Sequence, residues 1–247
     1  MPLHAAVRSL LGSSLARRSG HVIAAVGLTS TCALAFGAEL PAELLQPPCV
    51  ACQQPTGATP ELFSAADWRR LERGEVVIVE RSPEPTRGEG DRSVLRESEA
   101  AVLVPRPATE VWAVLADFES RPKVLPSVRE SHIERVDNNR AWIRQSVEIF
   151  WTKIQYTLIA TLEPARGLIT FVLDRSSPHD IRDTAGSWQV LRHGAASTLL
   201  LSRDRIDTGR PVPGTIQSYL VQRSLSQMMS SLRQEVQRRA GNGSVVR

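Results

Sequence analysis

The chain has 247 residues, 42% of them hydrophobic, which is enough for a globular domain with its own core. The formal net charge is +4, and residues 1–35 hold three arginines and no acid, so the rest of the chain carries only +1. A nearly neutral chain excludes a global electrostatic attraction to nucleic acid.

The N-terminal segment has the pattern of a targeting sequence. A basic, acid-free stretch ends at Arg18, an apolar run follows over residues 22–36, and Ala33 and Ala35 form an A-x-A cleavage site. The run is short and rich in small residues, unlike a membrane span. We expect residues 1–35 to be a signal segment and the protein to be exported, periplasmic or secreted. An Arg- and Ser-rich organellar transit peptide is the alternative.

Residues 36–62 form a proline-rich linker that contains one Cys-x-x-Cys pair, Cys49 and Cys52. A redox pair would follow a strand at a helix N-terminus, and none is predicted here. A metal site would need two more ligands, and the sequence has no second cysteine pair. We therefore expect a local disulfide in an oxidising compartment, or idle thiols.

Residues 63–92 are predicted to lead into the main domain through a short helix and a strand. Ser64 and Asp67 have the spacing of a capping box, and Gly74 is a natural helix end. Residues 76–79 are a compact strand signal, and a polar loop follows over 82–92.

From residue 93 onward the pattern is one strand, a helix, a run of strands and a last helix. Ala100, Val102 and Val104 alternate as in a strand, and apolar residues then recur at helical spacing from Pro107 until Pro122. Strand signals separated by turn residues follow at 133–136, 142–151, 154–162, 169–173, 188–191 and 198–206, with a polar loop at 174–186 and a turn at 192–194.

The last predicted element is a long amphipathic helix after Pro213. A helix of about 25 residues is ~37 Å long, enough to cross a whole sheet. Residues 241–247 are expected to form a tail. Strands that follow one another in sequence favour antiparallel pairing, so the fold class is α+β.

Several motifs of the main domain stand in a characteristic order. Within residues 101–127, AVLVPRPATEVWAVLADFESRPKVLPS, these are Pro105, Val111-Trp112, Asp117-Phe118, Pro122 and Pro126. Gly186-Ser187-Trp188 then opens a strand, and Val212-Pro213 precedes the last helix. With these motifs, residues 93–240 resemble the START-like (SRPBCC) superfamily, and most closely its polyketide cyclase/dehydrase-like and coenzyme Q-binding members.

The resemblance implies a helix-grip fold, in which a curved antiparallel sheet of about six to seven strands wraps on the long C-terminal helix and leaves an apolar cavity. It does not imply one activity, because a fold does not fix a function. Members of the superfamily include lipid and isoprenoid carriers, cyclases and antagonists of ribosomes.

Two kinds of residue are candidates for the cavity. Gln145 and Tyr156 are polar groups on otherwise apolar strand faces, so each needs either a hydrogen bond within the core or one from a ligand. Large apolar side chains could line the pocket or pack in the core, and these are Trp151, Phe171, Trp188, Tyr219 and Met228.

Candidates for catalysis are few. The sequence has no nucleophile elbow, phosphate-binding loop or dinucleotide fingerprint, and we expect no cofactor and no metal site. His179 with Asp180 and Asp183 is the only acid–histidine cluster, and the polar residues around it are typical of a solvated loop.

We therefore predict a binder or carrier of a hydrophobic small molecule such as a lipid, quinone, isoprenoid or polyketide-like compound. One alternative is a cyclase or dehydratase that acts on an enolisable apolar substrate. A second alternative is an exported module that docks a protein through its linker. Nucleic acid is not an expected partner, and peripheral membrane contact and the oligomeric state are left open.

Overall fold

A computed structural model describes residues 38–46, 63–80, 97–149, 152–194, 196–209 and 214–243. The predicted targeting segment 1–35 and the pair Cys49 and Cys52 lie outside these residues. The export of the protein and the state of the two thiols therefore stay predictions.

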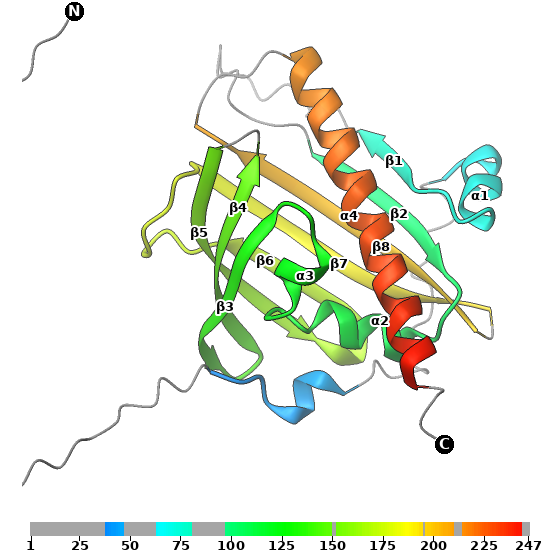
Figure 1. The fold of residues 1–247 in the computed structure, drawn as a ribbon, viewed down its shortest axis with the longest axis horizontal. Helices are drawn as coiled ribbons and strands as arrows, with labels where there is room; N and C mark the ends of the chain where they lie inside the picture. Colours follow the sequence, from blue (N-terminus) through cyan, green and yellow to red (C-terminus); the bar gives the residue numbers. More distant parts are fainter. Residues whose placement is uncertain are drawn as a thin grey trace, which may run out of the picture. The chain divides into compact units, whose positions relative to one another are not determined.

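The described strands form one antiparallel sheet in the order β1–β2–β8–β7–β6–β5–β4–β3 (Figure 1). Their bounds are β1 Val77–Glu80, β2 Ser98–Val104, β3 Val128–Asp137, β4 Arg140–Ile149, β5 Thr152–Glu163, β6 Leu168–Leu173, β7 Asp183–His193 and β8 Ser197–Asp207. The predicted antiparallel sheet is confirmed. It has eight strands rather than six to seven, because the lead-in strand β1 pairs with β2 and extends the sheet.

Two strands are longer than their sequence patterns indicate. β7 begins at Asp183, within the stretch 174–186 that we expected to be a loop, and β3 begins at Val128 rather than Ile133. Asp183 pairs with Asp207, and Thr184 pairs with Ile206. Backbone pairing does not depend on the polarity of the side chain, so hydropathy alone does not reveal these strand ends.

The lead-in helix α1, Ala65–Glu72, has both of its predicted ends. The Ser64 hydroxyl accepts from the Asp67 amide at 3.2 Å, and the Asp67 carboxylate accepts from the Ser64 amide at 3.1 Å, which completes the capping box. Gly74 follows the helix with φ +77°, a left-handed conformation that suits glycine.

The other three described α-helices lie along the face of the sheet that is opposite to α1 (Figure 1). α2, Ala108–Leu115, and the short α3, Arg121–Val124, connect β2 to β3 across the width of the sheet, and Pro122 lies in the first turn of α3. The long helix α4, Gly214–Gly243, packs against β1, β2, α2 and α3. It runs past residue 241, where a tail was expected.

Apolar side chains cover both faces of the sheet near β2. Val102 and Val104 belong to the main core with α2 and α4, whereas Ala101 belongs to a second cluster with Leu71 of α1. Successive side chains of a strand point to opposite faces, so β2 is apolar on both sides because helices cover both.

A short segment before α1 also packs on the domain. Ala42–Leu45 form a 3-10 helix, η1, and Leu44 is buried in the main core. The fully buried indole of Trp112 donates from Nε1 to the Leu44 carbonyl oxygen at 3.0 Å. This part of the predicted linker is thus bound to α2 through the tryptophan of the Val-Trp motif.

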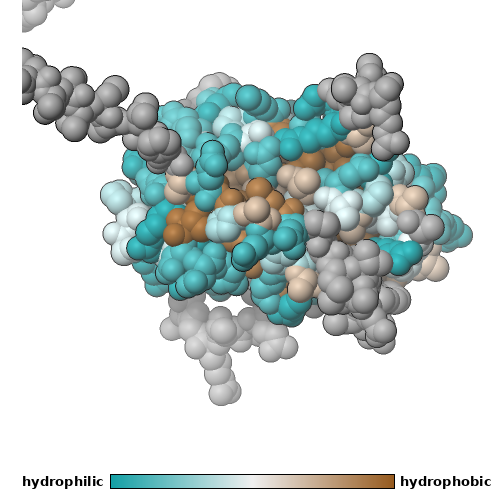
Figure 2. Space-filling view, turned by 90° about the horizontal axis from the view of Figure 1, so that it is seen from below, coloured by the Kyte–Doolittle hydropathy of each residue, from teal (hydrophilic) through white to brown (hydrophobic). Residues whose placement is uncertain are grey.

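Figure 2 shows a face of the molecule on which hydrophobic residues gather between hydrophilic ones. Among the described residues, the large hydrophobic side chains that remain exposed are Leu45 and Val172. None of the described helices has both the length and the apolar content needed to cross a bilayer.

Candidate ligand cavity

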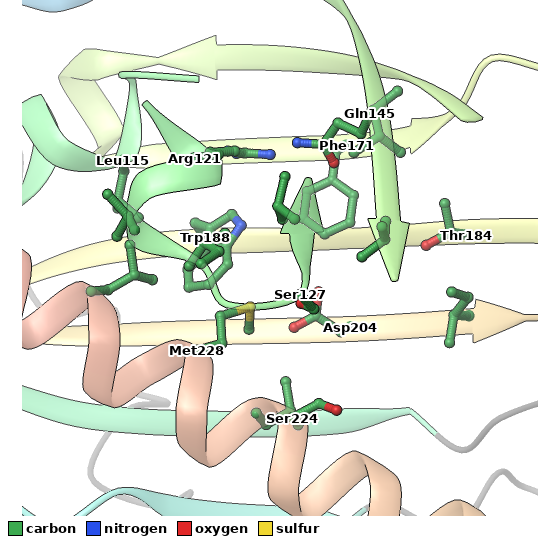
Figure 3. Close-up of a pocket in the computed structure, with 18 of the residues that line it drawn as sticks. Leu115, Arg121, Ser127, Gln145, Phe171, Thr184, Trp188, Asp204, Ser224 and Met228 are labelled. Atoms are coloured by element: carbon green, nitrogen blue, oxygen red, sulfur yellow. The ribbon is translucent and has the colours of Figure 1, made fainter. Parts of the chain in front are cut away.

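The space between the inner face of the sheet, α3 and α4 is not filled by side chains (Figure 3). It forms a cavity of about 220 Å³. The residues that line it come from α2, α3, α4, six strands and the segments beside α3, and they are Val114, Leu115, Asp117, Arg121, Val124, Leu125, Ser127, Val128, Gln145, Val147, Tyr156, Leu158, Phe171, Thr184, Trp188, Asp204, Arg205, Ile206, Ser224, Leu225, Met228 and Leu232.

Most of the cavity wall is apolar. Trp188 of β7 and Phe171 of β6 line the space from the sheet, and Met228 of α4 lines it from the helix, beside Trp188 (Figure 3). Small-molecule sites are usually apolar clefts of this kind with a few polar groups that orient the ligand.

Gly186 of the Gly-Ser-Trp motif makes room for one of these walls. It pairs with Phe171 across β6 and β7, and a side chain at position 186 would overlap the Phe171 ring and the Arg203 carbonyl oxygen. The absence of a Cβ thus lets the Phe171 ring, which lines the cavity, lie over Gly186.

One corner of the cavity is polar. The side chains of Arg121, Tyr156 and Asp204 lie close enough to one another to affect each other's ionisation. Burial lowers the pKa of Arg121 to about 10 and raises the pKa of Tyr156 to about 12. At neutral pH the guanidinium is therefore charged and the phenol is protonated.

Asp204 titrates near neutrality. Burial raises its pKa to about 6, against the opposing effects of a hydrogen bond from the Ser202 hydroxyl and of the Arg121 charge. The carboxyl group can thus exchange a proton at a pH where Arg121 and Tyr156 do not.

Gln145 both lines the cavity and forms a hydrogen bond within the core. Its side chain lines the cavity, and its amide donates to the Ser131 hydroxyl of the neighbouring strand at 3.2 Å. Gln145 also pairs with Tyr156 across β4 and β5, so the two polar groups lie side by side.

The residues from 96 to 237 match the family described as "Polyketide cyclase / dehydrase and lipid transport". The match spans more than half of the 247 residues. The chain belongs to this family. The helix α1 and the strand β1 lie before the matched range.

Solved structures with the same START-like fold include three bacterial proteins. The chain is 22% identical to the Zhui aromatase/cyclase of Streptomyces sp. R1128, with a TM-score of 0.52 over 59% of this chain and 95% of the other. A START superfamily protein of Mycobacterium smegmatis gives 22% and 0.52 over 57% and 97%. A STAR-related lipid transfer protein of Xanthomonas axonopodis gives 18% and 0.54 over 66% and 93%. A comparison with curated protein sequences gives no match.

The sequence predicted seven cavity residues for this family member. Gln145, Tyr156, Phe171, Trp188 and Met228 all line the space. Trp151 lies outside the described residues, and of Tyr219 only the backbone of α4 is described. The binding of a ligand by these residues stays a prediction.

Sequence reasoning missed Arg121 and Asp204. A signal for Asp204 was present, because Leu200 and Ser202 are buried on the inner face of β8 and residue 204 follows with the same alternation. Arg121 has no such signal, since it stands beside Pro122 in a segment that is too short for a periodic pattern.

The acid–histidine cluster does not assemble. His179 is exposed and contacts the Ser177 carbonyl, whereas Asp180 accepts from the Gln155 amide at 2.8 Å. Asp183 pairs with Arg175 and Arg205 instead. No group of three potential metal ligands occurs within the described ranges of the chain.

A charged network holds the end of α4 beside the cavity. Arg239 donates to Asp117, a cavity residue, at 2.8 Å and to Glu235 at 2.7 Å. The hydrogen bond from Arg238, with a further one from Arg239, lowers the pKa of Glu235 to about 2. These contacts fix the C-terminal half of α4 against the segment between α2 and α3.

Proposed function

We propose that this protein binds a hydrophobic small molecule in the cavity between the sheet and α4 and acts as its carrier or sequestering protein. The observation that carries the proposal is the cavity of about 220 Å³, with walls that are mainly apolar. A fully packed core would leave no space of this size, because protein interiors contain few voids larger than a water molecule.

The family and its structural neighbours agree with such a role. The family description names lipid transport beside polyketide cyclisation and dehydration. One structural neighbour is a STAR-related lipid transfer protein and another is an aromatase/cyclase. Binding of an apolar molecule is therefore common to a carrier role and to a cyclase role.

Native mass spectrometry after incubation with a total lipid extract tests the proposal. The wild-type protein should retain one bound small molecule, and M228W should lose at least about 90% of it, because an indole in place of Met228 fills the cavity. The matched control is Q227W, which adds the same side chain at an exposed position of α4 outside the lining. Equal occupancy in M228W and Q227W would place the ligand elsewhere.

A second candidate function is a cyclase or dehydratase activity. The observation that favours it is the polar corner, where Tyr156 can donate to a ligand carbonyl and Asp204 can accept a proton near neutral pH. Incubation with a linear poly-β-ketone should then give a cyclic product lighter by one water. Y156F and D204N should lose the product and keep the bound substrate, whereas a substrate recovered unchanged from the wild-type protein would leave only the carrier role.

A further inference from the structure

The polar corner has hydrogen-bond donors without matching acceptors. No carboxylate of a described residue forms an ion pair with Arg121, whose guanidinium carbon lies 4.5 Å from the centre of the Phe118 ring. In Figure 3 the Arg121 side chain extends across the cavity toward Gln145. By contrast, Arg205, the other arginine of the lining, pairs with Asp183, and Arg239 of α4 pairs with the lining residue Asp117.

Tyr156 supplies a second donor to this corner. Among the described residues no hydrogen bond to its hydroxyl is formed, and burial keeps the phenol protonated by raising its pKa to about 12. Both side chains are partly exposed to the cavity that they line. A ligand in the cavity is therefore in a position to supply the acceptor that Arg121 and Tyr156 lack among the described residues.

Asp204, the third residue of the polar corner, does not act as the acceptor for Arg121 and Tyr156. Its carboxylate accepts from the Ser202 hydroxyl and lies beyond ion-pair distance of Arg121. The amide nitrogen of Gln145 donates to Ser131, and among the described residues no hydrogen bond joins the Gln145 side chain to Arg121 or Tyr156. The unmet need in the corner is thus for an acceptor, and a negative charge satisfies a guanidinium best.

We propose that the ligand is a small apolar acid whose carboxylate lies between Arg121 and Tyr156, with its apolar body along Phe171, Trp188 and Met228. This inference rests on the proposed function and adds the chemical class of the ligand. The cavity of about 220 Å³ is below the ~300–1,000 Å³ typical of drug-sized sites, so a short acyl chain or a compact ring system fits it better than a two-chain lipid.

Calorimetry at pH 7.5 tests the inference by comparing the affinities for two probes of nearly equal size. The probes are octanoate and the neutral octanamide. The wild-type protein should bind octanoate at least about tenfold more tightly than octanamide, because a charge-assisted hydrogen bond is roughly twice as strong as a neutral one. R121M should weaken octanoate by about tenfold or more and change octanamide by less than about threefold.

Two further variants separate the charge effect from a loss of structure. Y156F keeps the ring and removes only the hydroxyl, and it should weaken octanoate by about three- to tenfold with little effect on octanamide. R166M removes a positive charge from the exposed turn after β5, away from the cavity, and both affinities should remain as in the wild type.

The outcomes distinguish this inference from the function on which it rests. If octanamide binds as tightly as octanoate, or if R121M weakens both probes equally, the acid preference is wrong and the cavity remains a site for neutral ligands. If neither probe binds to the wild-type protein while lipid extract also leaves no adduct, the proposed function itself fails and the acid preference fails with it.

Discussion

At the scale of single residues, burial in the cavity wall favours the protonated form of the Asp204 carboxyl group. The pKa of Asp204 is about 6 in the folded protein, above the 3.8 of an unperturbed aspartate, because burial disfavours its charged form. The sign follows directly. Asp204 contributes fully to stability below pH ~4, and this contribution is lost as the pH rises through about 6.

We therefore predict that D204N gains stability relative to the wild type as the pH rises from 4 to 7.5. The gain should be about 1–2 kcal/mol, less than ~1.4 kcal/mol for each unit of pKa shift, because Asp204 is only partly buried. Urea denaturation at a series of pH values measures it. A difference between the two proteins that stays constant with pH would contradict the shifted pKa.

Glu235 is a control of opposite sign. Arg238 and Arg239 lower its pKa to about 2, so its contribution is present above pH ~4.5 and is lost as the pH falls toward 2. E235Q should be less stable than the wild type at pH 7, and the two should converge at low pH.

At the scale of elements, the Gly-Ser-Trp motif links the sheet to the cavity. A methyl group at position 186 would overlap the backbone of β8, which cannot move away without disturbing the strand, and the Phe171 ring of β6, which would have to shift. The motif therefore determines how closely the strands and the ring can pack.

We predict that G186A lowers the free energy of unfolding by about 1–3 kcal/mol, as is typical of overpacking. The displaced Phe171 ring should also narrow the cavity and weaken ligand binding. The matched control is G241A, since a Cβ at that helical position meets no atom within 4 Å and alanine favours a helix. Equal stability of G186A and the wild type would show that the ring is free to move.

Regular elements could be predicted from the sequence because their local signals agree with the fold. The Ser64 cap, the apolar residues of β2 and the amphipathic α4 each have such a signal. The polar start of β7 at Asp183 has none, because backbone pairing alone makes it a strand. Arg121 of the polar corner could not be predicted for a related reason, since only the three-dimensional fold brings α3 over the sheet.

At the scale of the whole molecule, the sheet and α4 act together as a container. Helices cover both faces of β2, the η1 carbonyl of Leu44 is hydrogen-bonded to Trp112, and the charged network at Asp117 holds the end of α4. The interior that this frame encloses is left partly empty, and the central claim of our account is that a ligand occupies it.

The chain offers a direct probe of this claim, since it contains only three methionines. Met228 lines the cavity, whereas the adjacent Met229 is fully buried in the core outside the lining. NMR of the protein labelled with ¹³C at its methionine methyl groups would thus report on the cavity and on the core separately, with M228L to assign the signals.

On titration with octanoate, and separately with neutral 1-octanol, we predict that the Met228 methyl signal shifts and shows nuclear Overhauser contacts to the bound ligand, while the Met229 signal moves little. Binding of either ligand with no contact to Met228, or with equal shifts at both methionines, would contradict a ligand site beneath α4.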